Sequence, residues 1–157
     1  MSGNIVFTRG TAADLDEVDR LMIAAFDPEY GEAWTRAQLD AVLAMPGVWL
    51  TLARQGRQAV GFSLHRIILD EAELLLLAIA PEMRRRGIAR GLIERGCAEA
   101  RATGARRLHL EVREGNPATA LYRSAGFAPA GRRREYYRGA GGQISDALTL
   151  SRDLTRS

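Results

Sequence analysis

Four arginines and a glycine lie in the segment of residues 84–90, which reads Arg-Arg-Arg-Gly-Ile-Ala-Arg. Leu74–Ala80 before it is an unbroken apolar run, and from Ile88 onward apolar residues recur at helical spacing. The pattern predicts a strand buried on both faces, a turn rich in backbone N–H donors and a helix that begins at that turn. The first N–H groups of a helix have no internal partners and its dipole adds partial positive charge there. The chemistry expected of this segment is therefore phosphate binding.

Three positions of the segment, Arg84, Gly87 and Ala89, resemble the Arg/Gln-x-x-Gly-x-Gly/Ala pyrophosphate loop of the GNAT acyltransferases, which bind acetyl-coenzyme A. The glycine of such a loop lets a phosphate approach the backbone. A string this short also arises by chance, and an ordinary solvated turn explains it equally well. The surrounding elements and later motifs decide between these interpretations.

Hydrophobic periodicity and turn residues predict the elements that position this segment. Capping boxes at Thr11 and Thr35 start two helices, and two more helices run from Gly87 to about Thr103 and over Ala118–Ala125. The order β-α-α-β-β-β-α-β-α-β-β indicates one α/β domain over residues 1–157, with a mixed, mostly antiparallel sheet and about four helices. It resembles the GNAT fold element for element. The expected strands are Ile5–Arg9, Val48–Arg54, Ala59–Leu69, Leu74–Ala80, Arg107–Arg113, Phe127–Tyr137 and Ile144–Leu150.

Composition excludes several kinds of chemistry. All 22 basic residues are arginine, which excludes a lysine nucleophile or Schiff base. The single cysteine, Cys97, cannot form an internal disulfide, and its helical spacing predicts a core thiol. One cysteine and two scattered histidines form no zinc-type cluster, so we expect no metal. No apolar run is long enough to span a membrane and Met1–Gly10 lacks a signal-peptide pattern, so we expect a cytoplasmic protein without a membrane partner.

Two arginine clusters, Arg84–Arg86 and Arg132–Arg134, stand out although the net charge is only +3. Nucleic-acid binding is one interpretation of such clusters. The first cluster lies at a helix start, which favours neutralisation of a phosphate-bearing cofactor. We interpret the second as a solvated strand, and we do not expect nucleic acid as a partner.

Four further strings narrow the resemblance to the RimI-type ribosomal-protein alanine N-acetyltransferases within the GNAT superfamily. The likeness extends over about residues 60–150. The arginine-glycine turn identifies only the superfamily, whereas the later strings in this order are much more specific. They are Leu69-Asp70-Glu71-Ala72-Glu73-Leu74, Leu110-Glu111-Val112-Arg113 with Asn116, Ala120-Leu121-Tyr122 with Gly126-Phe127, and Arg133-Arg134-Glu135-Tyr136-Tyr137.

The resemblance implies that acetyl-CoA, as cosubstrate, contacts three segments of the chain. The backbone of Leu77, Ala78 and Ile79 would bind the pantetheine arm and the thioester carbonyl. Asn116 would contact the cofactor from the start of the next helix. The pyrophosphate would lie against Arg84, Arg85, Arg86, Gly87, Ile88, Ala89 and Arg90.

The resemblance also implies a direct acetyl transfer in which Glu111 is the general base and Tyr122 the acid that protonates the leaving thiolate. An α-amine has a pKa of about 8, so a carboxylate suffices to deprotonate it near neutrality. Trp34 and Tyr137 are expected on the acceptor side of the site. Cys97, expected in the core, is a poor candidate for a covalent nucleophile.

The residues alone leave structural alternatives open. Glu111 is equally suited to pair with Arg113 or His109 on the same face of its strand, and Tyr122 is suited to a core position. The chain is also one residue shorter than the RimI-type pattern between Asn116 and Tyr122, and residues 26–35 replace a compact string with a longer loop.

The favoured acceptor is a protein N-terminal α-amine, with a ribosomal protein as the partner and a monomer or weak dimer as the enzyme. One alternative is a GNAT that acts on a small amine such as an amino acid, polyamine or aminoglycoside, which the acidic residues Asp27, Glu29 and Glu32 keep open. The other is a non-catalytic module that binds coenzyme A or RNA.

Overall fold

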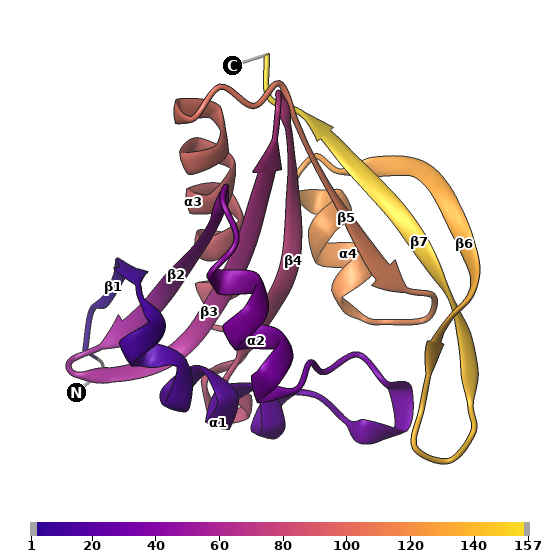
Figure 1. The fold of residues 1–157 in the computed structure, drawn as a ribbon, viewed down its shortest axis with the longest axis horizontal. Coiled ribbons are helices and arrows are strands. Elements are labelled where there is room, and N and C mark those ends of the chain that lie inside the picture. Colours follow the sequence, from indigo (N-terminus) through magenta and orange to yellow (C-terminus); the bar gives the residue numbers. More distant parts are fainter. Residues whose placement is uncertain (1–2, 156–157) are drawn as a thin grey trace.

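The computed structural model describes residues 3–155, and its elements follow the predicted order (Figure 1). A seven-stranded sheet has the spatial order β1-β2-β3-β4-β5-β7-β6. β4 and β5 pair in parallel and the other neighbours are antiparallel, which confirms the predicted mixed sheet. The strands are β1 (Ile5–Gly10), β2 (Val48–Gln55), β3 (Gln58–Ile68), β4 (Glu71–Ile79), β5 (Arg107–Arg113), β6 (Ala128–Arg138) and β7 (Ile144–Asp153).

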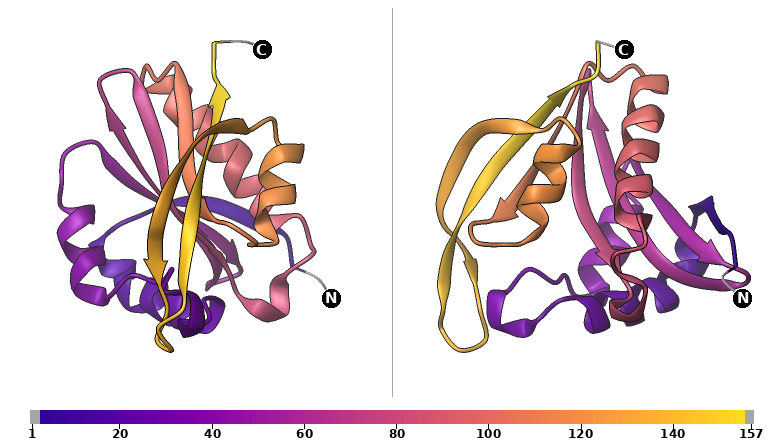
Figure 2. Two further views of the ribbon diagram at one scale, coloured as in Figure 1. Left: turned by 90° about the vertical axis from the view of Figure 1, so that its right-hand side faces the viewer. Right: turned by 180° about the vertical axis from the view of Figure 1, so that it is seen from behind.

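Four α-helices cover the sheet, with α1 and α2 on one face and α3 and α4 on the other (Figure 2). Thr11 and Thr35 form the predicted capping boxes with Asp14 and Gln38. Among residues 3–155, no helix is long and apolar enough to cross a membrane. The helices are α1 (Leu15–Ala25), α2 (Arg36–Leu43), α3 (Ile88–Ala102) and α4 (Ala118–Ser124), with short 3₁₀ turns η1 (Ala12–Asp14), η2 (Pro28–Tyr30) and η3 (Pro81–Met83).

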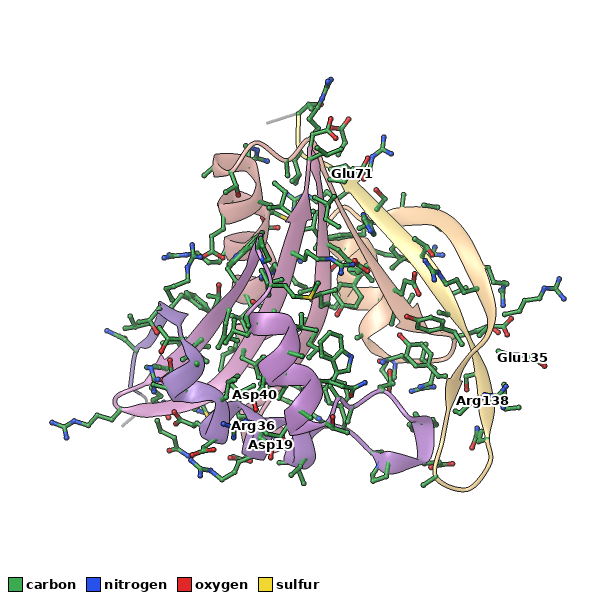
Figure 3. The ribbon with its side chains drawn as sticks, viewed as in Figure 1. Asp19, Arg36, Asp40, Glu71, Glu135 and Arg138 are labelled. Atoms are coloured by element: carbon green, nitrogen blue, oxygen red, sulfur yellow. The ribbon has the colours of Figure 1, made fainter. Side chains whose placement is uncertain are left out.

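The helices pack on the sheet through apolar side chains, and an ion pair joins α1 to α2. Cys97 of α3 is buried with Leu108 and Leu150 in one apolar cluster, which confirms the predicted core thiol. Burial raises the pKa of this thiol, so it carries little nucleophilic thiolate. Arg36, labelled in Figure 3 at the start of α2, pairs with Asp16 of α1.

β4 and β5 pair only over Glu71–Leu74 and Arg107–Leu110, and then diverge (Figure 1). Beyond this point β4 continues beside β3, and β5 continues beside β7. A bulge accompanies the divergence, because the register of β4 against β3 skips Leu75. Bulges increase the local twist of a strand. The result is a V-shaped opening in the middle of the sheet, and its closed end lies at the start of β4, where Figure 3 labels Glu71.

Two details of β4 correct the sequence-based expectation. The strand begins at Glu71 rather than Leu74, because the turn before it occupies only Leu69 and Asp70, with Leu69 in the left-handed region at a φ of 57°. β4 is also not buried on both faces. Leu75 and Leu77 are half-buried, since they line the opening left by the diverging strands.

Candidate active site

A cleft of about 450 Å³ occupies the opening between β4 and β5. Its walls come from these two strands, the start of α4 and the loop of residues 26–35. Trp34, expected on the acceptor side, does not line it and packs against the apolar core instead. The site residues predicted from the sequence that do line it are Leu77, Ala78, Ile79, Arg84, Ala89, Glu111, Asn116, Tyr122 and Tyr137.

The edge of β4 presents backbone groups to the cleft. The N–H of Ala80 donates to the carbonyl of Val60 in β3 at 2.8 Å. Successive residues of a strand direct their backbone groups to alternate sides, so Ala78 also faces β3, while Leu77 and Ile79 face the cleft. An unpaired strand edge can bind an extended ligand by main-chain hydrogen bonds.

The turn before α3 has the geometry of an anion cradle. Arg85 and Gly87 adopt left-handed backbone conformations with φ angles of 64° and 79°, and Gly87 is the N-cap of α3. No side chain within residues 3–155 caps this helix end, so its first N–H groups stay available to an anion. A β-carbon placed on Gly87 would meet no atom within 4 Å, so the backbone is open to approach.

The arginine side chains around this turn have different surroundings. Arg84 donates to the carbonyl of Ala25 at 2.8 Å, which ties the turn to the end of α1. Arg90 donates to the hydroxyl of Ser124 at 3.1 Å and so links α3 to α4. Arg85 and its neighbour at position 86 are exposed at the outer end of the turn. Exposed guanidinium groups beside a helix N-terminus add to its attraction for phosphate.

Glu111 of β5 holds a carboxylate against the cleft, with 11% of its side chain exposed. Its Oε1 lies 2.7 Å from Nε of Arg133 on β6. Its Oε2 is buried and has no hydrogen-bond partner among the described residues. Burial raises the pKa of this carboxyl group, and the charge of Arg133 opposes the rise. One oxygen is thus held while the other is free to accept a proton.

The sequence suggested Arg113 or His109 as the partner of Glu111, and the structure gives both residues other partners. Nε of Arg113 lies 3.4 Å from Oε1 of Glu32, and its guanidinium carbon is 3.7 Å from the centroid of the Tyr30 ring. His109 faces two carboxylates of β4 at 3.7 and 4.0 Å. Arg113 therefore holds the loop of residues 26–35 against the end of β5.

Tyr122 of α4 packs in the apolar core and also lines the cleft. Its ring meets that of Phe127 edge to face with centroids 6.0 Å apart, and it is 7% exposed. Burial, and then the nearby carboxylate of Glu32, raises the pKa of Tyr122, so the phenol keeps its proton at neutral pH. Across the cleft, the hydroxyl of Tyr137 donates to the backbone carbonyl of Glu111 at 3.4 Å.

Asn116 links the start of α4 to the loop of residues 26–35. Its Nδ2 donates to Oε2 of Glu32 at 2.8 Å, and its Oδ1 accepts from the N–H of Ala118 at 2.9 Å. The second bond satisfies one of the free N–H groups at the helix start, so the shortened segment still begins α4 directly after Pro117.

The loop of residues 26–35 also meets the hairpin between β6 and β7 (Figure 1). The N–H of Ala140 donates to the carbonyl of Pro28 at 3.1 Å. Gly31 has a φ of 68°, and a β-carbon there would lie 1.9 Å from the carbonyl oxygen of Arg138. Only glycine fits this contact, which closes the loop and the hairpin over one end of the cleft.

The sequence alone did not reveal two ion pairs of this site. It did not connect Glu32 with Arg113, because the two residues are far apart in the chain. Arg132–Arg134 are exposed on a strand, as expected, but the sequence revealed neither the pairing of Arg132 with acidic side chains nor that of Arg133 with Glu111. Within residues 3–155, no group of three or more His, Cys, Asp or Glu side chains is placed to hold a metal ion.

A family model described as "Acetyltransferase (GNAT) family" matches residues 15–127. This span contains the diverging strands, the arginine-glycine turn, Glu111 and Tyr122. The chain is a GNAT acetyltransferase. GNAT enzymes use acetyl-CoA, so it is an acetyl-CoA-dependent N-acetyltransferase, and the family inferred from its motifs is confirmed.

Curated relatives place this GNAT enzyme near the RimI type. It is 39% identical over 101 residues to the [ribosomal protein bS18]-alanine N-acetyltransferase of Escherichia coli K12, covering 64% of this chain and 67% of that protein. It is 36% identical over 151 residues to the N-alpha-acetyltransferase RimI of Mycobacterium tuberculosis, covering 93% and 89%. The crystal structure of the ribosomal-protein-S18-alanine N-acetyltransferase from Escherichia coli superposes with a TM-score of 0.86 at 27% identity, over 98% of this chain and 96% of that one. The predicted RimI-type resemblance is thus confirmed.

Proposed function

We propose that this GNAT enzyme acetylates the N-terminal α-amine of a protein, with the N-terminal alanine of ribosomal protein bS18 as the favoured acceptor. The observation that carries the proposal is the similarity over 93% of the chain to an N-alpha-acetyltransferase RimI, together with the bS18-alanine specificity named for further relatives. A ribosomal acceptor places the reaction in the cytoplasm.

The part of the site that suits acetyl-CoA is the edge of β4 together with the turn before α3. The N–H and carbonyl groups of Leu77 and Ile79 suit the amides of a pantetheine arm, and the alternation of β4 supports this role for them more than for the backbone of Ala78. The free N–H groups that follow Gly87, with the exposed guanidinium of Arg85 beside them, suit a pyrophosphate. When bound, acetyl-CoA supplies the activated acetyl group.

For the transfer itself, Glu111 accepts the proton of the acceptor ammonium on its free Oε2, directly or through a water molecule. The resulting neutral amine is the nucleophile. Tyr122 keeps its proton at neutral pH and donates it to the sulfur as the C–S bond breaks. The attacking nitrogen loses its second proton as the amide forms, and this proton restores the Tyr122 phenol, directly or through water. The leaving thiolate is poorly hydrated inside the cleft. This loss of hydration raises the pKa of the thiol, so the sulfur takes up a proton more readily. The backbone N–H of Ile79 is placed to donate to a carbonyl oxygen beside the β4 edge.

The carboxylates of the loop favour a protein acceptor over a small cationic amine. Asp27 accepts the N–H of Glu29 and so caps η2. Glu32 is paired with Arg113 and Asn116. A site for a polyamine or aminoglycoside needs carboxylates with free oxygens, and of the three acidic residues that suggested such an acceptor Glu32 has both oxygens engaged and Asp27 has one engaged.

The experiment is a mass-spectrometric transfer assay with acetyl-CoA and three acceptors. These are a peptide that begins with a free alanine amine, the same peptide blocked at its N-terminus but containing a lysine, and a pool of small amines. The proposal expects a gain of one acetyl group on the free-alanine peptide alone. Transfer only to the small amines would overturn the proposed acceptor and leave the GNAT assignment intact.

A further inference from the structure

Glu111 and Arg133 form an ion pair in which the two side chains differ greatly in solvent exposure. The Glu111 side chain is 11% exposed, whereas the Arg133 side chain is 61% exposed. Nε of Arg133 approaches Oε1 at 2.7 Å, and Oε2 remains buried without a hydrogen-bond partner among the described residues. Arg133 therefore covers the solvent side of the carboxylate and engages one oxygen only.

The conformation of β6 places Arg133 there. β6 bulges between Arg133 and Tyr137, and Glu135 within the bulge has a φ of 52°. The N–H of Glu135 donates to Oδ1 of Asp146 at 2.9 Å, and Arg132 bonds to Oδ2 of the same residue at 2.8 Å. These bonds to β7 hold the outermost strand of the sheet, on which Figure 3 labels Glu135.

The other charged and titratable groups near Glu111 supply less compensation for its burial. Glu73 of β4 raises the pKa of Glu111, and His109 of β5 lowers it less than Arg133 does. From β6, Tyr137 donates only to the backbone carbonyl, and Tyr136 is a phenol with a raised pKa. β7, which lies between β5 and β6, places Thr149 opposite Glu111 and contributes no charge there. Arg133 is the principal positive charge acting on this carboxylate.

We propose that Arg133 is a positioning residue for the transfer reaction, which fixes Oε1 of Glu111 so that Oε2 faces the acceptor as an ionised base. The proposal rests on the proposed role of Glu111 as general base. Arg133 touches neither the acetyl group nor the amine in this assignment, and it acts through Glu111 alone. An exposed arginine that merely screens the rim of the cleft would have no such effect, because surface ion pairs contribute little.

The chain offers a matched control in Arg134, the neighbouring arginine on β6, which is also exposed. The test compares the wild-type enzyme with Arg133→Gln, Arg133→Lys, Arg134→Gln and Glu111→Gln. The ionisation of Glu111 is followed by the pH dependence of the side-chain carboxyl ¹³C shift in glutamate-labelled enzyme without substrate. The signal of Glu111 is the one missing from Glu111→Gln.

We expect Arg133→Gln to raise the measured pKa of Glu111, Arg133→Lys to restore part of the shift, and Arg134→Gln to leave it at the wild-type value. A higher pKa means that more of the base is protonated at low pH. The kcat of Arg133→Gln should therefore fall about threefold to tenfold below wild type near pH 6 and approach it above pH 8. A purely structural defect would lower kcat by the same factor at every pH.

A double variant isolates the route of the effect. If Arg133 acts through Glu111, adding Arg133→Gln to Glu111→Gln causes no further loss of kcat. An unchanged Glu111 titration in Arg133→Gln, or an additive loss in the double variant, would overturn the proposal. Failure of the wild-type enzyme to acetylate any α-amine would instead overturn the proposed function, and the carboxyl titration, which uses no acceptor, tells the two failures apart.

Discussion

The two sides of the cleft are built in different ways. The cofactor side, residues 74–90, is one continuous segment that forms the β4 edge, the arginine-glycine turn and the start of α3. The acceptor side combines residues 26–35 with residues 137–143 of the β6–β7 hairpin, which meet only through tertiary contacts. A side built from one segment can be recognised from local sequence, whereas a side built from distant segments requires the fold.

The largest expected effect lies where the two sides meet. Glu111→Gln and Tyr122→Phe should each lower kcat by about 10²–10⁴, because each removes one proton transfer. Steady-state kinetics with the free-alanine peptide measures this. Glu114→Gln is the control, since this exposed carboxylate pairs with Arg132 outside the cleft. A Tyr122→Phe enzyme with unchanged turnover would remove Tyr122 from the role of acid.

The next effect tests the cofactor side alone. Gly87→Val should weaken acetyl-CoA binding by about 10-fold to 100-fold, because a β-branched residue resists a φ of 79° and crowds the anion cradle. Isothermal titration calorimetry measures the Kd. Gly104→Val imposes a similar strain, at a φ of 99°, beyond the other end of α3. If both variants weakened binding equally, the effect would come from lost stability and not from the cradle.

A smaller effect tests the acceptor side alone. Gly31→Ala should raise the KM for the peptide by about threefold to tenfold and leave the Kd of acetyl-CoA unchanged, because the added carbon overlaps the carbonyl of Arg138. Initial rates at saturating acetyl-CoA measure this. Gly56→Ala, in the turn between β2 and β3, has a similar left-handed strain at a φ of 62° with no atom within 4 Å. Equal changes in both variants would remove the contact between loop and hairpin from the account.

The smallest effect concerns the packing behind the cofactor side. Burial lowers the pKa of His65 to about 3, and α3 packs on it so closely that a β-carbon on Gly96 would lie 2.3 Å from Nε2. The unfolded state therefore binds a proton below about pH 6.5 that the folded state refuses, so stability falls as pH drops from 6.5 toward 3. From pH 7 to pH 5 the wild type should lose about 2 kcal/mol more than His65→Gln. Urea unfolding at both pH values measures this, and equal losses would contradict it.

The sequence predicts what local patterns specify. Periodicity located every strand and α-helix, and the capping boxes at Thr11 and Thr35 fixed two helix starts. The apolar run in β4 was harder to interpret, because half-burial of Leu75 and Leu77 results from the divergence of β4 and β5 and not from their own identity. Alternation along a strand places Leu77 and Ile79 toward the cleft only once its neighbours are known.

The contacts of the acceptor side could not be predicted from the sequence, because they join residues that are distant in the chain. Glu32 and Arg113 are 81 positions apart in the sequence, and no helical or strand periodicity relates two residues at that distance. The pairing of Arg133 with Glu111 likewise depends on a bulge in β6 and on the position of β7 between the two strands. The run of three arginines correctly predicts an exposed strand, but it does not reveal that Arg133 pairs with Glu111.

The most direct test of this division is a map of backbone amide shifts, recorded first with acetyl-CoA and then with the free-alanine peptide added. The account predicts that acetyl-CoA shifts the amides of residues 77–79 and 84–90, and that the peptide adds shifts in residues 27–32 and 137–143. Shifts from acetyl-CoA centred on the β6–β7 hairpin, or one shared set of residues for both ligands, would contradict it.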